Sequence, residues 1–426
     1  MDLAAAPAHT DATDLAALQR RTVRVLALGQ VVGSAGLGAA MTVSAFVVED
    51  IVGVHTPWVG IASTALTAGS GVAAELLSRT MRRCGRRIGM AWGYLVATLG
   101  CLLAFVGDQT SLLPVFVLGM LLYGAGPGTN MLARYAATDL APPGAQSRAM
   151  GRILFAATFG SVFGPLLVEP AERAGLSLGL DRYSGPWLLE AVCFALTGLL
   201  ILVLLRPDPL LTRLERATPG EPAASAAPDG RLLDSLRAIR GSRHASLALL
   251  AMVVVHASMV GMFALAPLEM RAHHHEGASA WMASLHVAAM FAFAPVAGRV
   301  ADRVGALAGI AGGTLLVVSA CLLAPGAATS VTMMLCSMFA LGLGWSLAFI
   351  SGSSLLIAAV APEFRVQVQG TADLLAAVGA GVASVVYGLG LDLVGFGAVC
   401  LVSITLTIPV LAWIASGRVE GRVGTA

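Results

Sequence analysis

Long hydrophobic runs, separated by short polar stretches, extend along almost the whole chain. Most of them approach the length of about 20 residues that a helix needs to cross a hydrocarbon layer of about 30 Å. The runs are continuous and do not alternate with a period of two, so they do not predict the strands of a membrane β-barrel. The pattern predicts an all-α, polytopic membrane protein. Twelve transmembrane helices are expected, at residues 23–47, 57–79, 88–107, 112–136, 149–169, 185–205, 245–268, 280–300, 306–324, 331–354, 368–390 and 394–415.

One polar segment, residues 206–244, interrupts this rhythm. Its middle part, residues 218–230, has a low-complexity composition that cannot bury a core. Residues 231–240 repeat Leu and Ile at helical spacing, which predicts a short amphipathic helix on the membrane surface. The segment divides the spans into six plus six. The expected regions are a tail at 1–22, a six-helix bundle at 23–205, the central loop at 206–244, a second bundle at 245–415 and a tail at 416–426.

The arginines indicate the orientation in the membrane. If the N-terminus lies in the cytoplasm and each helix crosses once, the outer segments hold only Arg173, Arg182 and Arg271. All other arginines then fall in cytoplasmic segments or at cytoplasmic helix ends, as the positive-inside rule requires. Both termini are therefore expected in the cytoplasm.

Composition agrees with a membrane protein and excludes several functions. Hydrophobic residues make up 57% of the chain and charged residues only 12%, whereas soluble domains have about a quarter of their residues charged. The net charge of +2 is too small to indicate a nucleic-acid partner. The chain has no lysine, so it cannot contain a phosphate-binding G-x-x-x-x-G-K-[ST] loop. Neither catalytic motifs nor paired cysteines occur, and we expect no enzymatic activity, cofactor or resident metal.

The two halves contain corresponding loops, which indicates an internal repeat. The loop after the second span contains Arg82, Gly85 and Arg86, and the loop after the eighth contains Gly298, Asp302, Arg303 and Gly305. Further along each half, a proline is followed eight residues later by a glycine: Pro143 with Gly151, and Pro362 with Gly370.

Over nearly its whole length the sequence resembles the major facilitator superfamily. The second loop is similar to the first part of the family's G-x-x-x-D-R-x-G-R-R motif, and in the first loop Arg82 stands where the family has Asp. The fifth span contains Gly160, Gly164 and Pro165, similar to the G-x-x-x-G-P element of bacterial drug:proton antiporters. In the fourth span Met120 replaces an arginine that the family often ties to proton coupling.

This resemblance implies two pseudo-symmetric six-helix bundles that expose a mid-membrane cavity to one side at a time. It also implies a monomeric secondary transporter in the bacterial cytoplasmic membrane. The expected function is proton-coupled export of a small organic substrate. An uptake carrier or facilitator is the first alternative, and a divalent-metal exporter or a non-transporting receptor ranks below it. The tract His273-His274-His275 in an outer loop is read as a solvated turn, with metal binding as the alternative.

Polar residues at membrane depth are costly and therefore require a reason. Arg134 is expected either to reach the inner surface or to contact an anion in the cavity, with Asp139 as its partner or as a helix cap. His256 and His286 are expected either to bond neutrally to a neighbouring helix, or to switch protonation or contact the substrate. By resemblance alone, Gln30, Asn130 and Trp345 are candidates for the cavity wall.

Charged residues near the cytoplasmic ends suggest a latch between the bundles. Asp302 is expected at the start of the fifth span, near Arg148 and Arg152, because a helix N-terminus favours an anion. A charge-reversed latch is expected in the other half, between Arg82 and Asp373, with pairing of Arg82 with Glu75 or Glu363 as the alternative. Glu75 is expected to pair with Arg79 four residues later. Glu190 is expected at the outer interface.

Overall fold

The computed structural model describes residues 7–35, 37–52, 61–163, 167–181, 183–216, 232–274, 278–328 and 330–416. Within these ranges the protein is helical, without strands. The first half contains eight long or medium helices: α1 (Pro7–Ala35), α2 (Leu37–Val52), α3 (Ile61–Gln109), α4 (Leu113–Tyr123), α5 (Ala125–Ala136), α6 (Gln146–Phe163), α7 (Val168–Ser177) and α8 (Ser184–Leu204).

Two short helices belong to the polar segment between the halves: α9 (Pro209–Glu215) and α10 (Leu232–Gly241). The second half consists of α11 (Arg243–Ala272), α12 (Ser279–Phe291), α13 (Ala294–Val304), α14 (Ala306–Leu323), α15 (Val331–Ala358) and α16 (Arg365–Ala415), with short 3₁₀ turns at Ala324–Ala328 and Pro362–Phe364.

The described parts of the expected spans are largely helical. Eight helices of the described residues are long and apolar enough to cross a membrane, or nine if the bent pair α12 and α13 counts as one span. The expected span at 23–47 falls on α1 and α2, and the described part of the span at 149–169 falls on α6 and the start of α7. The amphipathic helix expected at 231–240 is α10. The short helices α7 and α9 were not expected from the sequence.

Glycines break the long helices where the repeated loops occur. The helix α3 holds two spans that meet at Gly85, whose φ of 86° lies in the left-handed region. The corresponding Gly305 between α13 and α14 has a φ of 88°. Only glycine adopts this conformation without steric cost, so both loops turn the chain back into the membrane within a few residues.

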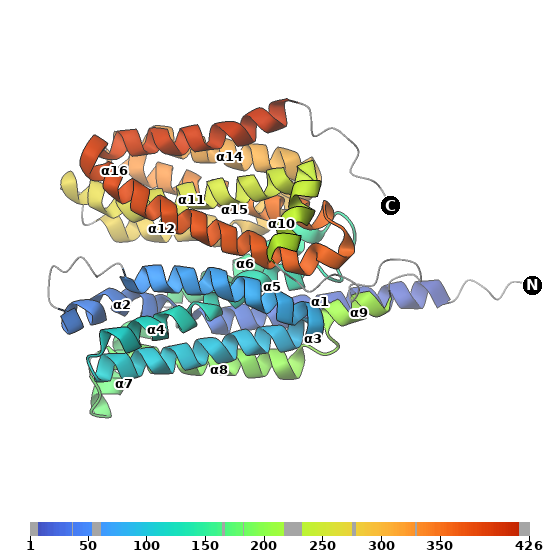
Figure 1. Cartoon of the computed structure of the whole chain (residues 1–426), viewed down its shortest axis with the longest axis horizontal. Helices are drawn as coiled ribbons and strands as arrows, with labels where there is room; N and C mark the ends of the chain where they lie inside the picture. Colours follow the sequence, from blue (N-terminus) through green and yellow to red (C-terminus); the bar gives the residue numbers. More distant parts are fainter. Residues whose placement is uncertain are drawn as a thin grey trace, which may run out of the picture.

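The two halves form two bundles, seen in Figure 1 as an upper layer of α10 to α16 and a lower layer of α1 to α9. One buried apolar core lies in the second bundle, and the other fills the first bundle and continues into α13, α15 and α16. The start of α1, the end of α16, α9 and α10 lie at one end of the molecule, whereas α2 and α7 lie at the other (Figure 1). The loops with Gly85 and Gly305 belong to the first of these, which we name the arginine-rich end.

The bundles meet closely at the arginine-rich end because small residues let their backbones approach. A Cβ atom on Gly298 of α13 would lie 2.4 Å from the backbone oxygen of Ser147 at the start of α6. A Cβ atom on Gly370 of α16 would lie 2.4 Å from the backbone oxygen of Ala74 in α3. The two contacts join the bundles in corresponding places.

Candidate functional site

A buried ion pair joins the two bundles. The Nη2 atom of Arg134, in the last turn of α5, lies 2.5 Å from Oδ1 of Asp373 in α16. The Arg134 side chain is 0% exposed and that of Asp373 is 8% exposed. A charge pair removed from water is stable only if further hydrogen bonds satisfy it.

Arg134 has such further partners. It donates hydrogen bonds to the backbone oxygen of Met131 at 2.6 Å and to the hydroxyl of Tyr135 at 2.9 Å. Its guanidinium also lies 4.8 Å from the centre of the Phe349 ring, which belongs to the other bundle. Arg134 is therefore a fixed buried group: it does not extend to the membrane surface, and its partner is Asp373.

Asp139, expected as a possible partner of Arg134, instead forms a second buried ion pair. Its Oδ2 atom lies 2.8 Å from Nε of Arg86, and both side chains are fully buried. Arg86 also donates to Oε1 of Gln369 in α16 at 2.9 Å. On the other side of Asp139, Arg213 of α9 approaches Oδ1 at 3.4 Å. This pair thus links the central segment, the first bundle and the second bundle.

Glu75 provides a third connection. It forms the expected ion pair with Arg79, with Nη2 and Oε1 2.9 Å apart. Its other oxygen, Oε2, accepts a hydrogen bond of 2.7 Å from the hydroxyl of Thr371 in α16. A carboxylate of the first bundle therefore holds the helix that carries Asp373 and Gln369.

The contact expected for Asp302 is present. Its two carboxylate oxygens accept hydrogen bonds from the backbone N–H groups of Ser147 and Arg148, at 3.1 and 3.0 Å. Arg148 also approaches the carboxylate with its Nε atom at 3.6 Å. These N–H groups open α6, so the anion caps the helix as expected from the helix dipole. Gly298, one turn earlier, provides the close approach that this contact needs.

The corresponding loop of the first half differs from the expected charge-reversed latch. Asp373 lies deeper than the loop and pairs with Arg134, so the prediction that it pairs with Arg82 is wrong in this structure. The loop is held instead by Asp208, whose Oδ2 accepts a hydrogen bond of 2.7 Å from the Arg87 backbone. Asp208 followed by Pro209 is a common helix start, and this signal in the sequence was missed.

Two arginines near the loops lie at the surface. Arg152 and Arg303 are exposed. We name the connected residues at the arginine-rich end the inter-bundle network: Glu75, Arg86, Arg134, Asp139, Asp302, Gln369, Thr371 and Asp373.

An aromatic cluster lies next to this network in the second bundle. The indole N–H of Trp345 donates to Nδ1 of His256 at 2.9 Å. Trp345 stacks on Phe349, with ring centres 4.9 Å apart, and meets Phe291 edge to face at 5.9 Å. Since Phe349 also contacts Arg134, the cluster continues from the ion pair along α15. Trp345 and Phe349 are buried and His256 is half-buried, so the cluster includes one partly accessible polar group.

His286 is placed by packing. Its Nδ1 atom lies 2.8 Å from the backbone oxygen of Met338 on α15, and its ring stacks on Phe263 at 4.6 Å. The side chain is 1% exposed. This arrangement matches the alternative of an imidazole bonded to a neighbouring helix.

Polar candidates of the first bundle also lie inside it. Asn130 accepts a hydrogen bond of 2.7 Å from the hydroxyl of Tyr94 and donates to the backbone oxygen of Gly33 at 3.3 Å. Gln30 is 4% exposed, and its Oε1 atom has no hydrogen-bond partner among the described residues. Tyr94 was not singled out from the sequence, because an isolated aromatic residue in an apolar run carries no signal.

Glu190 is the clearest difference from expectation. It does not lie at an interface: its side chain is 0% exposed within the first bundle. In the part of the chain that the structure describes, neither carboxylate oxygen has a hydrogen-bond partner. The neighbouring hydroxyl of Tyr123 and indole N–H of Trp187 are likewise without partners there. A buried carboxyl group without partners is rare enough to be a functional candidate.

Other candidates are placed as follows. Gly160 brings α6 against α1, since a Cβ atom there would lie 2.2 Å from Cβ of Ser34. Gly164 and Pro165 lie outside the described residues, as does His275. His273 contacts the backbone oxygen of Glu269 at 3.0 Å, and His274 is exposed.

Comparison with known proteins identifies the fold and the family. The profile of the Major Facilitator Superfamily matches residues 26–383. The chain belongs to this superfamily. It is 31% identical over 407 residues to the MFS-type transporter YdeG of Bacillus subtilis strain 168, which covers 93% of this chain and 92% of that protein.

Another relative is named for its substrate. The riboflavin transporter RfnT of Brucella anthropi is 26% identical over 370 residues, covering 86% of this chain and 87% of that protein. Among solved structures, the human organic anion transporter MFSD10 superposes with a TM-score of 0.73 at 18% identity, over 93% of this chain and 99% of that one. The transporter FucP in its outward conformation gives a TM-score of 0.67 at 15% identity, over 92% and 98%. These superpositions support the two-bundle fold of a membrane transporter.

Proposed function

We propose that the protein is a secondary active transporter whose inter-bundle network closes the cytoplasmic end of an alternating-access cavity. The observation that carries this proposal is the buried ion pair Arg134–Asp373 between the bundles. A pair that crosses a moving interface contributes only while the interface is closed. Opening that end would require its separation, so the pair biases a two-state equilibrium.

The orientation follows from the arginines. The arginine-rich end is assigned to the cytoplasm, with both termini on that side of a bacterial inner membrane. The inter-bundle contacts of Arg134, Arg86, Glu75 and Asp302 all belong to this end. The conformation is therefore proposed to be closed to the cytoplasm. The protein is proposed to act as a monomer, since each chain supplies both bundles.

Proton coupling is proposed to act through Asp373. Protonation of its carboxylate removes the charge that holds Arg134, and the interface then loses a buried ion pair. Leaving one member of such a pair without its counter-charge costs about 3–5 kcal/mol, which corresponds to a shift of more than a hundredfold in a two-state equilibrium. A proton that reaches Asp373 would thus favour opening to the cytoplasm. This route does not require the helix-4 arginine that Met120 replaces.

The substrate is proposed to be a small, largely apolar organic molecule that moves outward. The aromatic cluster of Trp345, Phe349 and Phe291, with the partly accessible His256, offers flat apolar faces and one polar group. Such walls suit aromatic compounds. Export is supported by the similarity of the Gly160 region to the G-x-x-x-G-P element, through which α6 approaches α1.

Transport by purified protein in liposomes tests these proposals. A panel of lipophilic and planar aromatic compounds is offered while a pH gradient is imposed, and compound movement and internal pH are followed together. We expect movement of a compound against its gradient, with proton flux in the opposite direction. Equal filling with and without the pH gradient would indicate a facilitator, and no compound movement would contradict transport of this substrate class.

Uptake of a planar heterocycle is a second candidate function. The relative RfnT is named as a riboflavin transporter, and a stacked wall of indole and phenyl rings suits a flat heteroaromatic ring system. Riboflavin is therefore part of the panel. Accumulation of riboflavin in cells that express the protein would favour uptake over export.

A further inference from the structure

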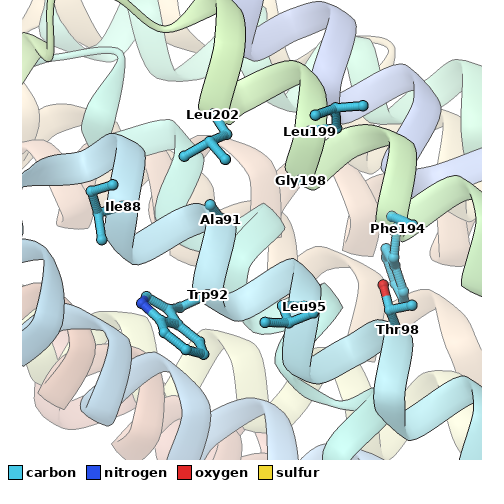
Figure 2. A pocket seen from close by; sticks show the side chains of 10 residues that line it. Ile88, Ala91, Trp92, Leu95, Thr98, Phe194, Gly198, Leu199 and Leu202 are labelled. Carbon is cyan, nitrogen blue, oxygen red and sulfur yellow. The ribbon is translucent and has the colours of Figure 1, made fainter.

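An apolar groove lies on the outer face of the first bundle. It runs between the second span of α3 and α8, and its volume is about 370 Å³. Ala91, Ala195 and Gly198 are the small residues of its lining. Trp92 and Leu95 of α3 and Leu199 and Leu202 of α8 are large, and Figure 2 shows their side chains around the open space.

The length of the groove matches the thickness of one membrane leaflet. It extends along α3 from Ile88 to Thr98, ten residues that rise about 15 Å along a helix. This is half of a hydrocarbon layer of about 30 Å. Ile88 lies three residues after the turn at Gly85, so the groove begins near the arginine-rich end and ends near the middle of the membrane.

The inner end of the groove is positively charged. Arg87 directly precedes Ile88, and Arg206 follows Leu202 by one helical turn. The two chain segments are tied together because the Arg87 backbone N–H donates to Oδ2 of Asp208 at 2.7 Å. The Asp208 carboxylate is occupied by this bond and by the N–H groups that open α9, from Leu210 and Leu211. Arg206 is exposed, and Arg87 is half-buried.

We propose that this groove binds an anionic phospholipid of the arginine-rich leaflet. One acyl chain would lie between Trp92 and Leu199, over the small residues, and the phosphate-bearing headgroup would lie between Arg87 and Arg206. The arginines attract the negative headgroup, and each basic residue near a membrane surface contributes about fivefold in affinity for anionic lipid. The apolar lining accepts the chain, whichever headgroup it carries.

A second copy of the protein fits this groove less well than a lipid. Two copies that share a membrane orientation are related by an axis along the membrane normal, and a twofold contact places the same surface of each against the other. Arg87 and Arg206 of one copy would then face the same arginines of the other at the same depth. Like charges repel in that arrangement, whereas a lipid phosphate neutralises them.

The bound headgroup would lie beside the inter-bundle network. Arg86, next to Arg87, forms the buried pair with Asp139 and the hydrogen bond to Gln369 across the bundles. A lipid bound at this site would therefore contact the loop that takes part in closing the arginine-rich end. The lipid composition of the membrane could act on the closed conformation through this contact.

Native mass spectrometry of the full-length, delipidated protein tests the proposal. Palmitoyl-oleoyl phosphatidylglycerol and the matching phosphatidylcholine are titrated in parallel. We expect tighter binding of phosphatidylglycerol to the wild type. The double variant Arg87→Gln with Arg206→Gln is expected to weaken phosphatidylglycerol binding about 25-fold, as two steps of about fivefold, and to leave phosphatidylcholine unchanged. Ala195→Trp, which fills the groove, is expected to weaken both lipids.

Arg299→Gln is the matched control, because Arg299 is also an exposed arginine but belongs to α13 of the other bundle. Equal effects of this control and of the double variant would overturn the site. So would a wild type that does not distinguish the two lipids, or a dimer that Ala195→Trp dissociates. If the double variant does not fold, quenching of wild-type tryptophan fluorescence by chain-brominated phosphatidylglycerol replaces it. Brominated phosphatidylglycerol is expected to quench the wild type more than brominated phosphatidylcholine does. We expect Trp92→Phe to remove this difference, and an unchanged difference contradicts the proposal.

Discussion

Arg134 and Asp373 are 239 positions apart in the chain, yet Nη2 of one and Oδ1 of the other lie 2.5 Å apart. Each bundle contributes one charge, and both side chains are buried. Neither residue would be stable at this depth alone, so the folded position of each depends on the other. Substitutions of this pair can therefore distinguish the effect of charge from the effect of packing.

Removing one charge is expected to be more damaging than removing both. Arg134→Met leaves Asp373 without its counter-charge and is expected to destabilise the closed conformation by about 3–5 kcal/mol. The double variant Arg134→Met with Asp373→Leu is expected to recover most of the thermal stability, because it replaces the pair by apolar side chains. Melting temperatures of the two single variants and the double variant in detergent measure the coupling. Additive losses would show that the two charges do not stabilise each other.

The same pair is expected to control access from the arginine-rich end. Met131 packs against the cores of both bundles and is therefore a reporter position. With Met131→Cys as the single cysteine, Asp373→Asn is expected to raise the rate of labelling from that side. When the pH is varied across the range in which the wild type changes conformation, the labelling rate of Asp373→Asn should not change. A rate that varies with pH as in the wild type would assign the pH response to another group.

Gly298 and Asp302 are expected to act together at the start of α6. Gly298→Val places side-chain atoms against the Ser147 backbone, where even a Cβ atom would approach to 2.4 Å. We expect it to open the arginine-rich end more than Asp302→Ala, which loses a helix cap worth about 1 kcal/mol. Gly312→Ala is the control, because a Cβ atom there would lie 3.6 Å from Leu347, an ordinary contact. Labelling of Met131→Cys compares the three, and an equal response of Gly312→Ala would make the effect nonspecific.

Glu190 is expected to lower the stability of the fold while it takes part in transport. Its carboxyl group is buried without partners among the described residues, and burial of an unsatisfied polar group costs about 1–3 kcal/mol. Glu190→Met should therefore raise the melting temperature. If the group takes part in proton movement, the same variant should lose transport driven by a pH gradient and keep exchange without a gradient. Asp181→Asn, at an exposed outer position, is the control. Lower stability of Glu190→Met would show that Glu190 supports the fold.

The orientation is testable with two single cysteines. Cys84 is exposed in the loop at Gly85, and Ser177 is exposed at the end of α7. In an otherwise cysteine-free protein, Ser177→Cys is expected to react with an impermeant maleimide added to intact cells. Cys84 alone is expected to react only after the membrane is opened. Reaction of Cys84 in intact cells would reverse the assigned topology.

The sequence by itself determined that the chain is helical and where most of its helices lie. Continuous apolar runs require a spanning helix, since backbone groups in hydrocarbon must bond within their own segment. For this reason the expected spans coincide with the helices of the structure, including the amphipathic α10. Local signals also predicted the pairing of Glu75 with Arg79, because residues four apart share a helix face.

The contact of Asp302 with α6 was also predictable, although its two sides are 155 positions apart. It depends on a repeated loop that resembles a known motif and on the general attraction of an anion to a helix N-terminus. The corresponding Arg82 had no such rule, and the partner assigned to it was wrong.

Only the tertiary structure decided which buried charges meet. Arg134, Arg86, Asp139 and Asp373 all have suitable residue types, but sequence distance does not tell which helix faces turn toward each other. That choice depends on how the two bundles dock, through backbone contacts at Gly298 and Gly370. Glu190 shows the same limit: the sequence placed it at an interface, whereas its complete burial near Tyr123 and Trp187 follows from helix rotation and packing. A hydrophobic run determines that a helix crosses the membrane. The helices packed against it determine which of its side chains meet which partners.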